Sequence, residues 1–418
     1  MGMVQPGRES QRSVRDAENT GGRESCKFRN VALGNGPSRI QPHRPMNRLR
    51  FLLSLPFLIA VPVSAADPLE FYIGTYTKPG GSLGIYRGTL NPESGELKAP
   101  VLAGETKSPS FLALHPNGKF LYAAAEAGGG AIGAFAIEKD GSLRKLNEDS
   151  TKGAGNCHVA VDAGGKNVLG ANYGSGSVAC LPIREDGSVA PASAFIQHMG
   201  SGPNAGRQKG PHAHSVYFNG GFAYTCDLGT DDIFVYRFDA AKGSLTPNDP
   251  PSGKVPPGSG PRHLAFHPKG GFAYVNNEMT SAISTFAHDA EKGTLTLLQT
   301  LSTLPADFPK DGKNSTAEIF CRPDGRFVYV SNRGHDSIAV FAIGADGKLT
   351  SLEVAPARVK EPRGFAISPD GRWLVAGGQN SNSLAAHKID PETGKLTPAG
   401  EVSGIGAPVC VVFVNAKH

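Results

Sequence analysis

The residues most able to do chemistry are histidines, arginines and acids that recur at two fixed places in a repeated pattern. One set opens short apolar segments such as 261–266, and the other ends the apolar segment that follows, as at 275–278. If two such segments pair as antiparallel strands, the start of one lies beside the end of the next. Guanidinium groups bind carboxylate or phosphate through paired hydrogen bonds, and a neighbouring imidazole or carboxyl group can transfer protons. The pattern therefore predicts a site for a small anionic substrate.

Within this site we expect Arg262, Arg333 and Arg363 to bind the anion. His214 or Glu278 is expected to act as the general base, with a pKa set by the neighbouring arginines. An arginine beside an ester carbonyl would also stabilise the oxyanion. Eight further residues occupy equivalent positions and are predicted to bind substrate: His158, Asn172, His212, Asp227, His263, Asn277, Glu318 and Asn332.

The elements that position these residues recur along the chain. Copies of the segment begin at residues 109, 155, 211, 261, 316, 362 and 408, so the period is 46 to 56 residues. Each copy consists of short strands separated by Gly-containing turns, and a period of this size predicts an all-β propeller. The N-terminal copy lacks a first strand, and the chain ends on an isolated one at 408–414. We therefore expect the C-terminal strand to complete the N-terminal blade, giving seven blades.

Two longer segments, 197–210 and 304–315, precede the first strands of two copies. Loops on a rigid scaffold often carry function, so these two are candidates for a pocket wall or lid. The same scaffold leaves one ambiguity open. A register slip of one residue reverses the faces of a strand, so the sequence does not decide which of His212 and His214 faces the channel.

The domain organisation follows from the ends of the repeat. Residues 67–418 are predicted to form one propeller domain, expected to be a monomer. Residues 46–66 read as a signal peptide, with positive charge at 46–50, an apolar run at 51–63 and small residues after it. This predicts export to the periplasm or medium, without stable membrane insertion after cleavage. Residues 1–45 are either an over-extended reading frame or a disordered extension.

Charge argues against nucleic acid as a partner. Residues 1–66 carry 10 Lys and Arg against 4 Asp and Glu, whereas the remainder carries 32 against 33. The propeller therefore has no net basic charge suited to a polyanion. Five cysteines follow the leader without C-x-x-C spacing, and we interpret them as small buried residues rather than disulfide partners or nucleophiles. They are Cys157, Cys180, Cys226, Cys321 and Cys410.

Three local motifs are weak indicators of other chemistry. Gly80–Gly84 matches the G-x-S-x-G pattern of a nucleophilic serine, but no helix is expected after it. Gly128–Gly133 matches G-x-G-x-x-G, although a strand rather than a helix is expected to follow. His212 and His214, with Asp227 on the paired strand, are a conceivable metal site, yet no further acidic or Cys/His cluster accompanies them. We expect no metal and no other cofactor.

Several motifs resemble one known family. They are Gly210–Val216, Asp227–Asp231, Gly260–Pro268, Val275–Glu278, Val330–Ile338 and Asp390–Gly394. Together they are similar to the seven-bladed lactonase family, which comprises the propeller-type bacterial 6-phosphogluconolactonases and the fungal carboxy-muconate lactonizing enzymes. The resemblance covers residues 70–415. It implies hydrolysis of a lactone, with a small anionic sugar lactone or sugar acid as ligand.

The resemblance also implies a catalytic set. The family's proposed active-site residues correspond to His214, Arg262, Glu278 and Arg333. For lactone hydrolysis we therefore expect His214 and Glu278 to share proton transfer, one activating water and the other protonating the leaving alkoxide. One departure is Gly364, where the family usually has a bulkier residue, and this predicts a mouth that is open on one side. The predicted signal peptide is a second departure, because 6-phosphogluconolactone is a cytosolic intermediate. It suggests that the substrate is another lactone or sugar acid.

Other functions remain compatible with the same residues. A cycloisomerase would run lactone chemistry in reverse on an unsaturated diacid, as the fungal relatives do. A non-catalytic exported propeller would bind a sugar or a protein. A calcium-dependent lactonase is a weaker variant, since it needs a ring of carboxylates and amides at the channel.

Overall fold

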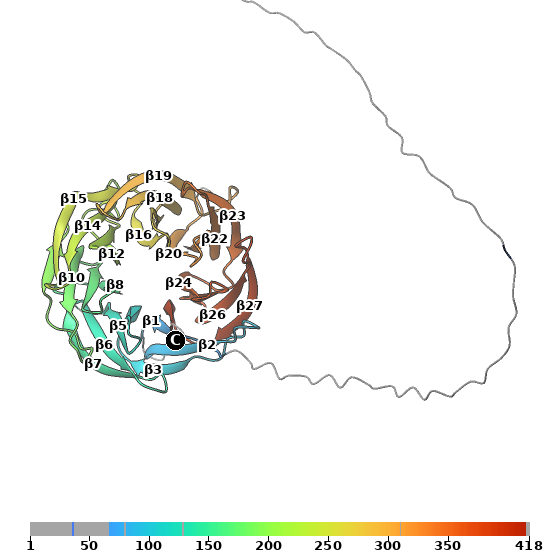
Figure 1. The fold of residues 1–418 in the computed structure, drawn as a ribbon, viewed down its shortest axis with the longest axis horizontal. Coiled ribbons are helices and arrows are strands. Elements are labelled where there is room, and N and C mark those ends of the chain that lie inside the picture. Colours follow the sequence, from blue (N-terminus) through green and yellow to red (C-terminus); the bar gives the residue numbers. More distant parts are fainter. Residues whose placement is uncertain (1–35, 37–66, 79–80, 128, 310, 415–418) are drawn as a thin grey trace, which may run out of the picture. The chain divides into compact units, whose positions relative to one another are not determined.

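The structure is a computed structural model that describes residues 36, 67–78, 81–127, 129–309 and 311–414. The predicted signal peptide and nearly all of 1–45 lie outside these residues. The regular elements in the described part are 28 strands arranged as seven four-stranded sheets, and it contains no helix that is long and apolar enough to cross a membrane. Figure 1 shows the sheets packed as blades around a central axis. The predicted all-β, seven-bladed propeller is confirmed.

Six blades are formed by consecutive strands, with the first strand next to the axis and the fourth at the perimeter (Figure 1). Blades 2 to 4 contain β4 (Pro109–Leu114), β5 (Phe120–Ala125), β6 (Ala131–Ile137) and β7 (Leu143–Ser150); β8 (Asn156–Val161), β9 (Asn167–Asn172), β10 (Ser177–Pro182) and β11 (Ala194–Gln197); and β12 (Ala213–Asn219), β13 (Phe222–Asp227), β14 (Asp232–Asp239) and β15 (Ser244–Lys254). Blades 5 to 7 contain β16 (Pro261–Phe266), β17 (Phe272–Asn277), β18 (Ala282–Asp289) and β19 (Thr294–Ser302); β20 (Ser315–Cys321), β21 (Phe327–Arg333), β22 (Ser337–Ile343) and β23 (Leu349–Pro356); and β24 (Pro362–Ile367), β25 (Trp373–Gly378), β26 (Ser383–Ile389) and β27 (Leu396–Ser403).

Blade 1 closes the ring with strands from both ends of the propeller. Its order is β28 (Pro408–Phe413), β1 (Leu69–Thr75), β2 (Gly84–Leu90) and β3 (Val101–Glu105). β28 pairs antiparallel with β1, so that Tyr72 lies opposite Val412. The C-terminal strand therefore completes the N-terminal blade, as predicted, and satisfies backbone groups that would otherwise form an open sheet edge.

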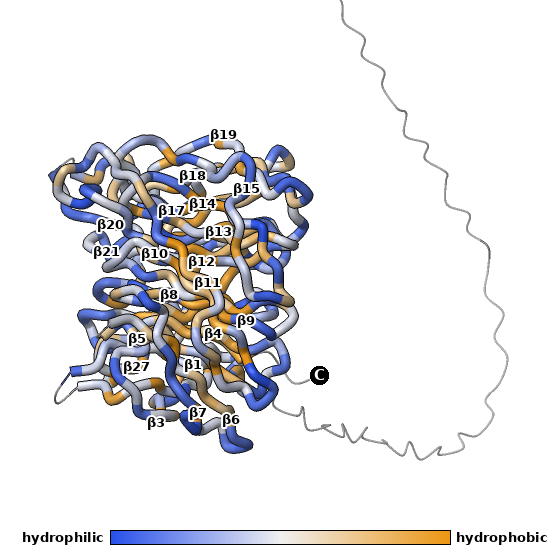
Figure 2. Tube along the Cα trace, turned by 90° about the vertical axis from the view of Figure 1, so that its left-hand side faces the viewer, coloured by the Kyte–Doolittle hydropathy of each residue, from blue (hydrophilic) through white to orange (hydrophobic). Residues whose placement is uncertain are grey.

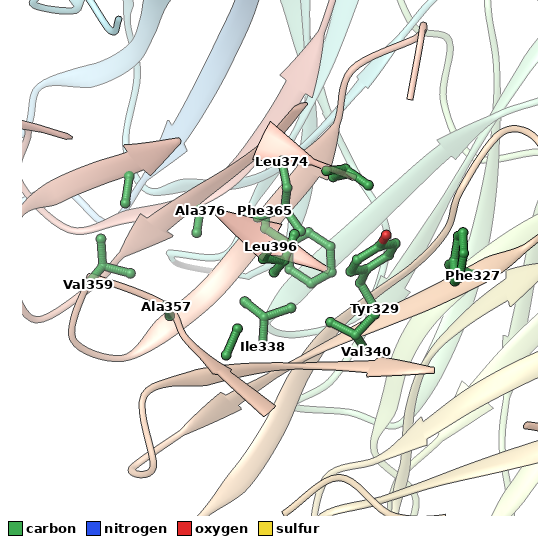
Figure 3. Close-up of a cluster of buried hydrophobic side chains, with 13 residues drawn as sticks. Phe327, Tyr329, Ile338, Val340, Ala357, Val359, Phe365, Leu374, Ala376 and Leu396 are labelled. Atoms are coloured by element: carbon green, nitrogen blue, oxygen red, sulfur yellow. The ribbon is translucent and has the colours of Figure 1, made fainter. Parts of the chain in front are cut away.

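The core lies between the blades, and this explains the sequence of each strand. Middle strands such as β21 are buried along their whole length because both faces pack against neighbouring blades. Outer strands such as β7 instead carry many exposed residues. Figure 3 shows one interblade cluster, in which Tyr329 and Ile338 of blade 6 lie near Phe365 and Leu374 of blade 7. Figure 2 shows the same division, with hydrophobic residues concentrated along the inner strands and hydrophilic residues in many of the turns.

A repeated tyrosine contact fixes neighbouring blades to one another. The hydroxyl groups of Tyr122 in β5 and Tyr329 in β21 donate to the turn carbonyl groups of Gly187 and Gly394 in the following blades, at 2.9 and 2.8 Å. Gly187 has a φ of 83°, and a Cβ there would collide with the ring of Phe120. The turn needs glycine for both reasons. These contacts explain why a glycine-containing turn recurs in the sequence.

The discounted motifs are structural, as predicted. Ser82 precedes β2 and Gly133 lies within β6, so a strand follows each motif where a nucleophile elbow or a dinucleotide fold requires a helix. The five cysteines of the propeller are free thiols, and four of them are buried.

Candidate active site

The candidate residues meet at one end of the propeller because of a repeated backbone irregularity. We call this end the mouth: it is formed by the starts of the first strands and the ends of the second strands, which pair directly, as Pro261 does with Asn277. In β12, β16 and β24 the register shifts at the second residue of the strand, and these residues are His214, Arg262 and Arg363. A bulge of this kind re-aims a side chain, and bulges often occur beside active sites.

The re-aimed side chains surround a small cavity at the mouth. It has a volume of about 10 Å³, roughly the space needed for one water molecule. Ten residues from six blades line it: Tyr76, Ser110, Phe111, Glu126, Cys157, His214, Arg262, His263, Arg363 and Val409. Any ligand larger than a water molecule must bind outside this cavity or displace side chains to reach it.

Glu278 is the centre of the charge cluster. Its carboxylate lies 3.1 Å from Nε of Arg262, 3.1 Å from Nη2 of Arg333 and 2.8 Å from Nη2 of Arg207. Burial alone would raise the pKa of this carboxyl, but Arg333, Arg262 and Arg207 lower it from 4.5 to about 2. Glu278 is therefore ionised at neutral pH and is the shared counter-ion of three guanidinium groups.

His214 is the imidazole next to this cluster. Its Nε2 lies 3.9 Å from the Glu278 carboxylate, and its Nδ1 lies 3.9 Å from Sγ of Cys157. Burial lowers its pKa well below the usual 6.5, and the positive charge of Arg262 acts in the same direction. The ring is therefore neutral at pH 7 and has a nitrogen able to accept a proton. Of the two histidines left open by the sequence, His214 is the one beside Glu278.

A second buried carboxyl group, that of Glu318, helps to position Arg262 through His263. Nη1 of Arg262 donates to Nε2 of His263 at 3.2 Å and to the carbonyl oxygen of Ala317. Because arginine can only donate, the proton of the neutral His263 ring is on Nδ1, which lies 2.6 Å from Oε1 of Glu318. Burial raises the pKa of Glu318 to about 8, although Arg262 opposes the shift, and burial also lowers the pKa of His263. His263 and Glu318 therefore orient Arg262, and the His263 ring also forms part of the cavity wall.

The buried Glu318 makes stability depend on pH. Its folded-state pKa is about 8 against an ordinary value of 4.5, so between these values the folded protein retains a proton that the unfolded chain has released. Stability contributed by this group is full below pH 4.5 and is lost as pH rises to 8, at about 1.4 kcal/mol per pH unit. The denaturant midpoint of Glu318→Gln should therefore rise relative to that of the wild type between pH 5 and pH 8. The exposed control Glu401→Gln should show a constant difference, and a constant difference for Glu318→Gln would contradict the assignment.

Arg363 reaches the same mouth from β24 in blade 7. Its guanidinium is 5.3 Å from the ring centre of Tyr76, whose hydroxyl donates to Glu126 at 2.8 Å. Among the described groups no hydrogen bond to the Arg363 side chain is present, whereas Arg262 and Arg333 are both committed to Glu278. Arg363 is therefore a half-buried cation of this site with donors still available to a ligand.

Several predicted binding residues lie outside the cluster. Asn172, Asn277 and Asn332 end or nearly end their strands and donate to a serine of the third strand of the same blade, at 2.8 to 3.1 Å. Asp227 accepts from the backbone of residue 212 and lies 2.6 Å from Nδ1 of the buried His198. These side chains stabilise the blades in the structure.

The two remaining predicted histidines have different surroundings. His212 stacks on Tyr173 at the surface of the mouth, and its Nδ1 lies 2.9 Å from the Tyr173 carbonyl oxygen. His158 stacks on Phe111 and lies edge-on to His263, and its buried Nε2 has no partner among the described residues. Within the described residues no three His, Cys, Asp or Glu side chains are close enough to hold a metal ion.

Arg207 is the residue of the cluster that sequence reasoning missed. It lies in the long segment before β12, which the sequence marks as a candidate pocket wall without indicating a specific residue. The other long segment lines a separate groove of about 900 Å³ between blades 5 and 6, with Phe308 and Leu304 among its walls. That groove contains none of the clustered charged side chains.

The expectation that Gly364 opens the mouth is wrong. A Cβ at this position would collide with the backbone of Val409 in β28, the first strand of the adjacent blade 1. Glycine is required here because β24 and β28 approach closely. The missing side chain therefore serves blade packing and leaves the width of the mouth unchanged.

The chain is similar to a known family and to several known proteins. The family described as "Lactonase, 7-bladed beta-propeller" matches residues 70–413. A 6-phosphogluconolactonase of Bacillus subtilis is 38% identical over 349 residues, which are 82% of this chain and 98% of the relative. A 6-phosphogluconolactonase of Formosa agariphila is 33% identical over 335 residues, covering 78% of this chain and 94% of the relative.

A solved structure shows the same architecture. The periplasmic gluconolactonase PpgL of Pseudomonas aeruginosa superposes with a TM-score of 0.79 at 34% identity, covering 84% of this chain and all of that protein. The family match at residues 70–413 spans strands of all seven blades.

Proposed function

Because the chain belongs to the seven-bladed β-propeller lactonase family, we propose that it hydrolyses the ring ester of a small sugar lactone at the mouth. The observation that carries this proposal is a neutral, buried imidazole, His214, beside an ionised carboxylate that holds a row of guanidinium groups. Ester hydrolysis needs a base for water and positive charge for the oxyanion, and this cluster contains both.

The geometry supports His214 as the group that moves protons. Its Nε2 takes a proton from water while the water oxygen attacks the lactone carbonyl carbon. When the ring C–O bond breaks, the same nitrogen returns the proton to the leaving alkoxide. The product is a hydroxy acid, which releases its carboxyl proton to solvent. Between the two transfers the imidazolium is stabilised by the Glu278 carboxylate, 3.9 Å away.

Glu278 has a different role from the shared proton transfer expected from sequence. A carboxylate with a pKa of about 2 is a poor proton donor and a weak base at neutral pH. Its contribution is to hold Arg262 and Arg333 in position for the oxyanion. Nε of Arg333 is a buried donor without a partner among the described residues, and it is suited to this charge.

The substrate class follows from the remaining charge and from the relatives. Arg363 is positioned to bind the hydroxyl or acidic groups of the sugar. Two relatives are named 6-phosphogluconolactonase and a structural neighbour is named a periplasmic gluconolactonase. The periplasmic neighbour and the predicted signal peptide together support an exported enzyme that acts on a gluconolactone, with or without phosphate.

The test is hydrolysis of a lactone panel by the purified protein, with and without chelator. We expect turnover of 6-phosphogluconolactone or glucono-1,5-lactone that chelator leaves unchanged. Loss of turnover with chelator would favour the calcium-dependent variant. Conversion of a carboxy-muconate without turnover of sugar lactones would favour the cycloisomerase, and no turnover of any lactone would reject the proposal.

A further inference from the structure

The segment between β11 and β12, residues 198–212, brings a fourth arginine to the mouth. Nη2 of Arg207 donates to Oε1 of Glu278 at 2.8 Å and to the hydroxyl of Tyr173 at 3.0 Å. Tyr173 follows β9 in blade 3 and Glu278 follows β17 in blade 5. A single side chain therefore joins two non-adjacent blades across the surface of the site.

The segment is built to present this arginine. The side chain of the next residue, Gln208, is fully buried and donates to the carbonyl oxygen of Leu228 at 2.8 Å and to Oδ1 of Asp231 at 2.9 Å. The same Asp231 oxygen accepts the backbone N–H of Gly260, one residue before β16. The backbone beside Arg207 is thus fixed to blades 4 and 5, while the arginine side chain itself extends over the mouth.

Arg207 is also the cation of the cluster best placed to change partners. Its side chain is 47% exposed, against 3% for Arg262 and 8% for Arg333. The two buried arginines also donate to backbone carbonyl groups, whereas the partners of Arg207 are the side chains of Glu278 and Tyr173. The cavity beneath the cluster has only about 10 Å³, so a substrate that reaches Glu278 must displace a surface contact.

We propose that Arg207 is a specificity residue that exchanges Glu278 for the anionic arm of the substrate, a phosphate monoester or a second carboxylate. The inference rests on the proposed lactone hydrolysis for its biological meaning. A substrate with its ester at His214 extends its far end toward solvent, where Arg207 lies. An anionic arm there replaces the Glu278 carboxylate as the counter-ion of Arg207, whereas a neutral arm leaves the guanidinium without a counter-ion.

Binding of product anions tests this assignment without relying on turnover. Calorimetry with 6-phosphogluconate, glucarate and gluconate compares phosphate, carboxylate and neutral arms on the same sugar acid. We expect Arg207→Gln to weaken 6-phosphogluconate binding by about 10- to 100-fold more than gluconate binding, the loss of one charge-assisted contact. Arg207→Lys should recover part of the loss. Dependence of glucarate binding on Arg207 would extend the site to carboxylates, and dependence of 6-phosphogluconate alone would restrict it to phosphate.

The matched control is Arg144→Gln, which removes an arginine from an exposed pair with Glu138 on the outer strand β7. It should leave all three affinities unchanged. Equal weakening of all ligands by Arg207→Gln, or no weakening, would overturn the assignment. Lactone turnover is then measured on the same proteins. Arg207-dependent binding without any lactone turnover would reject the proposed hydrolysis while leaving the role of Arg207 intact.

Discussion

Replacing Glu278 by glutamine is expected to lower both turnover and stability. The substitution keeps the shape of the side chain but leaves three guanidinium groups, two of them buried, without their common counter-ion. Removing one partner of a buried ion pair typically costs about 3–5 kcal/mol, because the remaining charge stays desolvated. Turnover should fall by about 100-fold or more, since the oxyanion donors lose their orientation and the His214 imidazolium loses its stabilising charge.

The pH dependence distinguishes this effect from general damage to the fold. The folded-state pKa of Glu278 is about 2 against an ordinary 4.5, so its contribution to stability is present above pH 4.5 and is lost as pH falls toward 2. The gap between wild type and Glu278→Gln in denaturant midpoint should therefore close over this range. Glu401→Gln, which breaks an exposed pair with Arg358, should change stability by less than about 1 kcal/mol at any pH. A pH-independent gap for Glu278→Gln would contradict the ionised cluster.

The fold was predictable because its signals are local and repeated. The spacing of the strand segments predicts the four-stranded blades. The unpaired strand at the C-terminus predicts the ring closure that β28 and β1 form. Apolar second strands and glycine turns recur because each blade packs on two others. These constraints act at every repeat, so an error at one copy leaves the period visible in the rest.

The candidate site was less predictable because its side chains depend on irregular backbone. Alternation along a regular strand would give His212 and His214 the same surroundings, but His212 precedes β12 and the register shifts at His214. Asn172, Asn277 and Asn332 occupy mouth positions by sequence, but a serine on the third strand of each blade binds their amides. Such partners follow from pairing register, which a single sequence does not fix.

Arg207 was missed for another reason. It lies in a loop with no repeat equivalent, and its place depends on the buried contacts of Gln208 with two other segments. Non-local contacts of this kind have no periodic signature. The length of the segment was the available signal, and it indicates a functional loop without identifying the residue that acts.

Replacing His214 by glutamine is expected to reduce kcat by about 1,000-fold, within the range that general acid–base catalysis contributes. A glutamine amide retains a polar group near the position of Nε2 but accepts no proton at the relevant pH. Folding should be affected less than in Glu278→Gln, because the imidazole is neutral and Glu278 keeps its arginine partners. The control is His115→Gln, in the turn after β4 at the end of the blade opposite the mouth, which should retain wild-type kcat.

The pH profile decides whether His214 is the base or only fills space. Activity requires the unprotonated ring, so kcat/KM should rise with pH through the His214 pKa and level off above it. Burial and Arg262 hold that pKa well below 6.5, which places the rise on the acid side of pH 6.5. Residual activity in His214→Gln should lack this rise. If the rise persists there unchanged, the titrating base is another group and the proton transfer must be reassigned, although the arginine cluster would still account for oxyanion binding.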